Sequence, residues 1–231
     1  MADGDMPELA LVDSSDLNYF NAMQSFVNVT EQIENLDDYL PEAIASCKVD
    51  GQMKGMPLGM NCAALFCNTE MLEEAGVQVP KTWDELQETA LKLTKEDRYG
   101  FAMPALRSEE SVFSFLPLLW GYGGKIAEIE SEESQAAFLK LRELSESGAM
   151  SPQVNNLTSG DIGRQFMEGN VAMVLVTSAL QQTIQKEKPN LKYVMTLPPS
   201  GDENKECVTA IGGEVPVSYT HLRAHETSAH L

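Results

Sequence analysis

Short runs of apolar residues alternate along this chain with longer segments whose apolar residues recur at helical spacing. An apolar run of about four to eight residues between turn signals fits a buried β-strand, whereas recurrence every three or four residues is typical of an amphipathic helix. Alternating strands and helices favour helices packed on a sheet, so we expect an α/β protein. Strands are expected at Leu9–Val12, Ala63–Phe66, Tyr99–Met103, Val171–Val176 and Tyr193–Leu197.

Capping residues and glycines mark where the helices begin and end. The clearest start is Thr82-Trp83-Asp84-Glu85, in which Thr82 is placed to cap and Glu85 stands at the return position of a capping box. Trp83 lies inside this box and is expected to pack rather than to touch a ligand. Further helices are expected from Ser111 to Leu119, after Ser131, from Asp161 to Glu168, and after Ser178 as the cap.

The charge of the chain excludes one class of partner. There are 35 acidic and 16 basic side chains, which gives a net charge of −19. A field of that sign repels nucleic-acid phosphates, so no nucleic acid is expected. No apolar run reaches the length of about 18 residues that a membrane span needs. The first residues are acidic and lack the cationic start of a signal peptide.

The last residues differ in composition from the rest. All three histidines, His221, His225 and His230, fall within the last 11 residues. The His221–His225 spacing could hold zinc on a helix, but the His-Glu-x-x-His pattern of zinc proteases is missed by one residue. The segment from Tyr219 to Thr227 also resembles a translated sequencing adaptor. Residues 215–231 are therefore expected to be a non-native tail that contributes nothing to the fold, and no metal site is expected.

Catalytic patterns are scarce. The glycines after Trp120 lack the spacing of a phosphate-binding loop, and no histidine precedes His221 to serve a serine or cysteine nucleophile. Paired carboxylates could still act as in a glycosidase, since the chain is rich in acids. No enzyme and no cofactor are expected, with a carboxylate-based glycosidase left as an alternative.

A series of motifs resembles the extracellular solute-binding proteins of bacterial ABC importers, in the sugar-binding group that includes maltose-binding protein. Six matches occur in family order; Glu8 and Cys67 depart from the usual residues. The matching segments are 4–9 (GDMPEL), 54–58 (KGMPL), 66–68 (FCN), 74–86 (EAG with PKTWDEL), 120–124 (WGYGG) and 166–173 (FMEGNVAM).

This resemblance implies a periplasmic-binding-protein-like fold of two α/β lobes with the first lobe truncated. Residues 1–60 would be part of the first lobe, 61–207 the second lobe, and 208–214 the strand that crosses back. The implied function is to capture a sugar or oligosaccharide between the lobes, close on it, and deliver it to the permease subunits of the importer. A monomer outside the cytoplasm is expected, free or lipid-anchored. The alternative ligand is another solute, such as a polyamine or an oligopeptide.

The resemblance also suggests where ligand contacts would lie, namely in loops at strand ends and at the two crossovers. Asp13, Ser15 and Glu214 would hydrogen-bond hydroxyls, and Trp120 would stack on a sugar ring. Two other readings stay open: residues 13–16 could be a solvated loop and helix cap, and Trp120 could belong to the core. Asn61 stands where the resemblance would place an acid. The expected contacts are Asp13, Ser15, Asn61, Trp120, Ser178 and Glu214.

Overall fold

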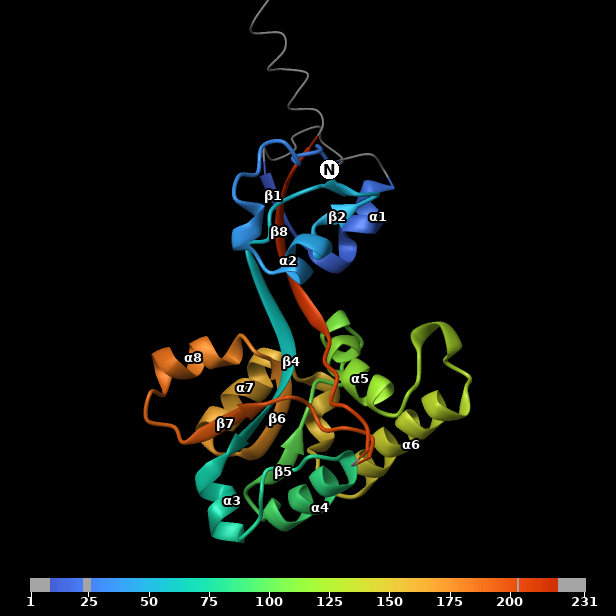
Figure 1. Ribbon diagram of the computed structural model, residues 1–231. Coiled ribbons are helices and arrows are strands. Elements are labelled where there is room, and N and C mark those ends of the chain that lie inside the picture. Colours follow the sequence, from blue (N-terminus) through green and yellow to red (C-terminus); the bar gives the residue numbers. More distant parts are fainter. Residues whose placement is uncertain (1–8, 23–25, 203, 220–231) are drawn as a thin grey trace, which may run out of the picture. The chain divides into compact units, whose positions relative to one another are not determined.

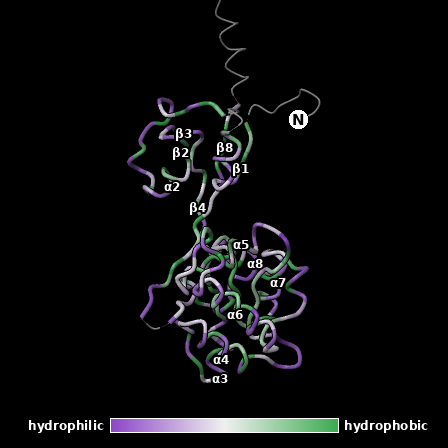
Figure 2. Tube along the Cα trace, turned by 90° about the vertical axis from the view of Figure 1, so that its right-hand side faces the viewer, coloured by the Kyte–Doolittle hydropathy of each residue, from purple (hydrophilic) through white to green (hydrophobic). Residues whose placement is uncertain are grey.

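The computed structural model describes residues 9–22, 26–202 and 204–219, and it has a mixed α/β fold as expected. The chain forms two compact units (Figure 1). Unit 1 comprises Met1–Asn61 and Ile211–Leu231, and unit 2 comprises Cys62–Ala210. The chain therefore passes from one unit to the other twice. Along both units the trace changes repeatedly between hydrophobic and hydrophilic stretches (Figure 2).

Unit 2 is built on a sheet whose strands run in the order β7-β4-β6-β5. The neighbours β4 and β6 are antiparallel, β4 and β7 are antiparallel, and β5 and β6 are parallel. Residues 171–176 of β6 are all buried, as a strand covered on both faces requires. The strands are β4 (Gly59–Asn68), β5 (Tyr99–Ala102), β6 (Val171–Thr177) and β7 (Tyr193–Thr196).

Helices of unit 2 begin largely where the sequence predicts. The Thr82–Glu85 capping box is present, and the side chain of Asn68 caps α3, which stops at the left-handed Gly76. The expected cap at Ser178 is wrong, because the N-cap of α8 is Ala179. The helices are α3 (Thr69–Ala75), α4 (Trp83–Leu93), α5 (Glu109–Gly121), α6 (Glu132–Glu146), α7 (Ser159–Glu168) and α8 (Leu180–Glu187), with 3-10 turns η3 (Ile126–Glu128) and η4 (Pro152–Asn156).

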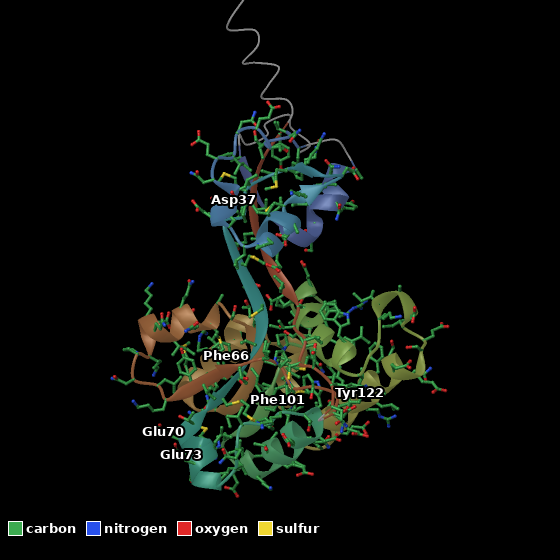
Figure 3. All side chains as sticks on the ribbon, viewed as in Figure 1. Asp37, Phe66, Glu70, Glu73, Phe101 and Tyr122 are labelled. Carbon is green, nitrogen blue, oxygen red and sulfur yellow. The ribbon has the colours of Figure 1, made fainter. Side chains whose placement is uncertain are left out.

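Large apolar side chains fill the interior of unit 2. Phe66 on β4 and Phe101 on β5 are fully buried (Figure 3). Phe166 on α7 is fully buried too, and its ring meets that of Phe66 edge to face at 6.3 Å. Trp83 is also fully buried, which confirms that it packs in the core. The hydrogen-bonded sheet and the filled core of unit 2 hold its surface residues in place.

Unit 1 has a smaller core. Leu17, Met53, Val215 and Val217 are among the residues buried there. The Asp50-Gly51 pair, with positive φ at both residues, turns β2 into β3 as two-residue hairpins favour. Its elements are β1 (Leu9–Asp13), η1 (Ser14–Asp16), α1 (Leu17–Asn21), η2 (Leu36–Asp38), α2 (Pro41–Ser46), β2 (Lys48–Val49), β3 (Gln52–Met53) and β8 (Ile211–Ser218).

The expectation that residues 215–231 contribute nothing to the fold is wrong for residues 215–219. Strand β8 begins at Ile211, rather than at the expected 208, and pairs antiparallel with all of β1, from Asp13 opposite Glu214 to Leu9 opposite Ser218. Val215 and Val217 are 1% exposed, and the ring of Tyr219 lies 5.6 Å from that of Phe26. The histidine pattern indicates a break in composition, but it does not locate the last residue that the core needs. Residues 220–231, including the three histidines, lie outside the described residues.

Two truncations should therefore behave differently. Removing residues 220–231 is expected to leave the midpoint of thermal unfolding unchanged. Removing residues 215–231 should destabilise unit 1 by several kcal/mol, because a fully buried valine or larger side chain contributes about 1.5–3 kcal/mol. Differential scanning calorimetry of the two truncated chains tests this. Equal midpoints for both would mean that β8 does not hold unit 1 together beyond Glu214.

Candidate functional site

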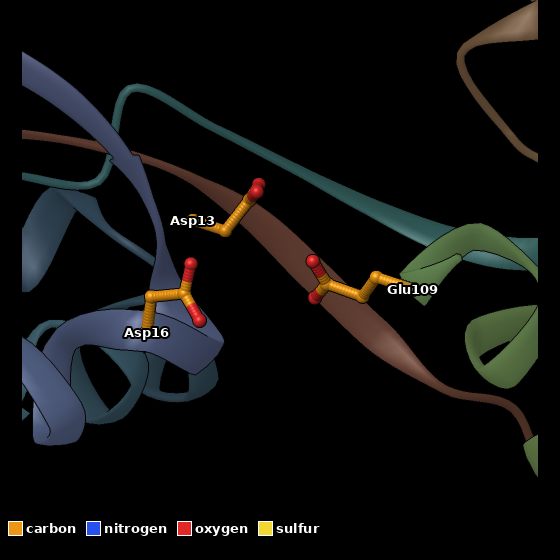
Figure 4. Close-up of side chains that lie close together, drawn as sticks. All are labelled: Asp13, Asp16 and Glu109. Atoms are coloured by element: carbon orange, nitrogen blue, oxygen red, sulfur yellow. The ribbon is translucent and has the colours of Figure 1, made fainter. Parts of the chain in front are cut away.

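Carboxylates gather where β1 of unit 1 ends. Asp13 is the last residue of β1 and lies directly opposite Glu214 on β8; both side chains are exposed. Asp16 follows at the end of η1 (Figure 4). Two like charges directly opposite each other on an antiparallel ladder are destabilising. The fold thus holds together acids that repel one another, as a site with an incoming donor group would.

The electrostatics of Asp13 reflect this crowding. Partial burial raises the pKa of its carboxyl above the ordinary value, and the negative charges of Asp16 and Glu214 raise the pKa further. Ionised carboxylates are acceptors only, and they bind hydroxyl or ammonium donors through short, charge-assisted hydrogen bonds. Asp13 and Glu214, predicted separately from the sequence, are brought together by the β1–β8 register.

Ser15 and Asn61 belong to the same unit. Ser15 is exposed in η1, between Asp13 and Asp16 in the chain. Asn61 is half-buried on β4. Close to it in the chain, the backbone N–H of Leu58 donates to the carbonyl of Glu214 at 3.1 Å. This bond ties the start of the first crossover to the carboxylate-bearing strand.

Ser178 in unit 2 has a structural role that the sequence does not reveal. Its backbone N–H donates to the carbonyl of Cys62 at 2.7 Å, and its hydroxyl accepts from the N–H of Cys62 at 3.1 Å. These two bonds continue the β4–β6 pairing past the end of β6. The hydroxyl proton can still be donated elsewhere, so a ligand contact at Ser178 remains a prediction.

Trp120 lies near the end of α5, just before Gly123, whose φ of +90° allows the turn. The tryptophan is half-buried and packs against the core of unit 2. One part of its indole is thus committed to packing, and stacking on a sugar by the remainder stays a prediction.

One acid near Asp13 was not among the predicted contacts. Asp16 is in the same polar run as Asp13, and its charge contributes to the raised pKa of Asp13. The sequence signal was present, since a turn directly after a strand brings such neighbours close. Asp16 becomes part of an acidic cluster only because Glu214 lies opposite Asp13, and that position is set by the strand register.

Two hollows in unit 2 involve none of the predicted contact residues. The larger has a volume of about 620 Å³ and the smaller about 380 Å³. Both are bordered by the loop between α3 and α4, including Val79, Pro80 and Lys81. In the part of the chain that the structure describes, no helix has the length and apolar character needed to cross a membrane.

Comparison with known protein families decides the class of the chain. The family model for bacterial extracellular solute-binding proteins matches residues 1–229. This chain belongs to that family. The family resemblance read from the sequence motifs is thereby confirmed.

Similar members of the solute-binding family share its fold. A curated binding protein of Brucella abortus is 28% identical over 163 residues, covering 66% of this chain and 39% of the relative. A solute-binding protein of Thermotoga lettingae, solved with α-D-tagatose, superposes with a TM-score of 0.85 at 23% identity. Maltose-bound MalE3 of T. maritima gives a TM-score of 0.86, also at 23% identity. These structures confirm the periplasmic-binding-protein-like fold.

The chain spans only part of these solute-binding proteins. The two structures match 95% of this chain, but the matched region is 60% and 59% of their own lengths. It spans about two fifths of the curated relative. The expectation of a truncated fold is thereby confirmed.

Replacing Asp13 by asparagine should make unit 1 more stable at neutral pH. A carboxyl whose pKa is raised on folding stabilises the fold below its unfolded pKa and loses that contribution as pH rises through the folded value. Asp13→Asn removes the repulsion, so the gain should be a few tenths of a kcal/mol, up to about 1 kcal/mol, at pH 7. It should vanish near pH 3, below the unfolded pKa of about 3.9.

Denaturant unfolding of the variant at both pH values measures this gain. Asp37→Asn is the matched control, because Asp37 is an exposed acid on η2 of the same unit (Figure 3). An equal gain from both variants, or a gain from Asp13→Asn that persists at low pH, would contradict the role of the Asp13–Glu214 pair.

Proposed function

We propose that this chain is part of the solute-capturing subunit of an ABC importer and that its solute is a neutral, hydroxyl-rich molecule, a sugar or a polyol. The observation that carries this is the crowding of Asp13, Asp16 and Glu214 in a chain of the solute-binding family. Similar structures were solved with tagatose and with maltose, which supports the same solute class.

Hydroxyls suit these carboxylates physically. Each sugar hydroxyl can donate to a carboxylate and accept from a neighbouring N–H or hydroxyl, so a polyol relieves the repulsion between acids without adding charge. Asp13, Ser15, Asn61 and Glu214 would supply contacts from unit 1. Trp120 and Ser178 would supply them from unit 2, with Trp120 covering an apolar face of the ring.

Transport would depend on a solute that binds to groups on both units. A ligand held by groups on both units stabilises the conformation in which all its contacts are made. Because the chain passes between the units twice, small backbone rotations at those passages can change the relation of the units. The ligand-stabilised form would dock on the permease subunits outside the cytoplasm. No chemistry on the solute is needed.

A cationic solute is the second candidate. The same three acids would attract a polyamine or the amino group of a peptide, and a net charge of −19 favours the approach of a cation. The dependence of affinity on ionic strength distinguishes the two candidate solutes. Binding of a multivalent cation weakens steeply as ionic strength rises, whereas binding of a neutral sugar does not.

Calorimetric titration of the full-length parent protein tests the proposal. Maltose, tagatose and mannitol are the neutral probes, and spermidine is the cationic one. At least one neutral probe should bind, and Asp13→Ala should weaken that binding about tenfold, equivalent to roughly 1.4 kcal/mol. Trp120→Ala should weaken it similarly with little change in the unfolding midpoint.

Two controls and two contradicting outcomes make the result decisive. Asp37→Ala should leave affinity unchanged. The present chain should bind more weakly than the parent, because it spans about 60% of the solved relatives. Salt-sensitive binding of spermidine, with no response to the three neutral probes, would replace the sugar proposal by the cationic one. A collapse of unit 2 in Trp120→Ala would place this residue in the core alone.

A further inference from the structure

Strand β1 is apolar on both of its faces. Its residues Leu9, Ala10, Leu11 and Val12 form an unbroken apolar run. Ala10 and Val12 pack against the core of unit 1, whereas the side chains of Leu9 and Leu11 are 65% and 53% exposed. An antiparallel sheet with one face in water alternates apolar and polar residues, and a run without alternation is typical of a strand covered on both faces. The outer face of β1 therefore has the composition of a buried face.

The neighbouring strand extends this apolar face. In the β1–β8 register Leu11 lies directly opposite Pro216, and residues directly opposite each other point to the same side of the ladder. We call Leu9, Leu11 and Pro216 the β1 outer face. A single exposed leucine on a protein surface needs no explanation. Adjoining apolar residues on one sheet face indicate contact with another apolar surface.

Strand β6 of unit 2 shows how such a run is accommodated elsewhere in the chain. Residues 171–176 of β6 are also apolar throughout, and all of them are buried. Helices α4, α5 and α7 contact β6, and helices surround the strands of unit 2 (Figure 1). By contrast, β1 stands at the end of its strand order, and among the described residues β8 is the strand that pairs with it. In the described part of unit 1, the β1 outer face lacks the kind of cover that β6 has.

The lengths of related proteins indicate where a cover would come from. The tagatose-bound and maltose-bound relatives match 95% of this chain, but the match takes up only 60% and 59% of their own lengths. About two fifths of each relative therefore has no counterpart in this chain. A second copy of the chain is disfavoured, because each copy carries a net charge of −19 and Asp13 follows Leu11 on the same face.

We infer that the β1 outer face is an internal interface of the parent protein, covered by an apolar segment that lies outside this chain. The segment would pack on Leu9, Leu11 and Pro216 and end where the face becomes acidic, at Asp13 and Glu214. Its end would therefore border the carboxylates that the proposed function assigns to the solute. The inference shares with that proposal the premise of a longer parent protein, but it requires no particular solute.

Labelling of an introduced cysteine tests whether the face is covered. Leu11→Cys is prepared in the present chain and in the full-length parent, both with Cys207→Ser because Cys207 is exposed. Peptide mass spectrometry after a pulse of maleimide measures the labelling of each site separately. Position 11 should label quickly in the present chain and at least about tenfold more slowly in the parent, because a covered thiol reacts only when its cover opens.

Asp37→Cys is the matched control for this labelling. Asp37 is an exposed residue of unit 1 on η2, so this position should label at the same rate in both proteins. Equal rates at position 11 in the two proteins, whether fast or slow, would overturn the inference. Light scattering distinguishes a cover within one parent chain from a second copy. Protection that appears only in a dimer of the parent would also overturn the inference.

The stability of the two proteins provides an independent measurement. Leu11→Thr keeps a residue that favours strands but makes the side chain polar. In the present chain, where Leu11 is exposed, the midpoint of thermal unfolding should change little. In the parent, where the side chain would be covered, the midpoint should fall by several degrees.

Val12→Thr is the control on the same strand. Val12 packs against the core of unit 1 and should lower the midpoint of both proteins when it is made polar. A fall of equal size from Leu11→Thr in both proteins, or a fall in neither, would contradict the cover. None of these measurements involves a solute, so the interface and the proposed function can fail separately.

Discussion

The pairing of β1 with β8 is the interaction on which unit 1 depends. It joins residues near the two ends of the chain, and its inner face supplies Val215 and Val217 to a core that is otherwise small. Two strands alone are marginally stable in water, so the apolar contacts beneath them are as necessary as the ladder itself. The same register sets Asp13 against Glu214, so the contact that builds the unit also creates its acidic face.

At this position the stability of the strand pair is therefore opposed to the proposed binding of a solute. A ladder chosen for stability alone would pair Asp13 with a cation or a neutral residue. Partial burial, followed by the charges of Asp16 and Glu214, instead raises the pKa of Asp13, and the repulsion between Asp13 and Glu214 weakens the strand pair. In a solute-binding protein, that cost is understandable if the solute supplies the missing donors.

Local signals in the sequence predicted the local structure well. The Thr82–Glu85 capping box, the buried run of β6 and the start of α6 after Ser131 all depend on neighbouring residues, and each is found where the sequence places it. Non-local features were harder to predict. The pairing of Glu214 with Asp13 and the hydrogen bonds between Ser178 and Cys62 depend on how strands from distant parts of the sequence align with each other. Composition and residue spacing do not encode that alignment. Residues 215–219 were misjudged for the same reason, because their importance lies in what they pair with.

The division of the chain also bears on how it folds as it leaves the ribosome. All of unit 2 is continuous, from Cys62 to Ala210, whereas unit 1 needs residues from both sides of it. Segments made first can fold first, so unit 2 can complete its sheet while β1 still has no partner. Unit 1 must then close a very long loop, which is a slow step because the contacts are so distant in sequence. Within the described residues β8 is the strand that pairs with β1, so this edge of β1 stays open until β8 has been made.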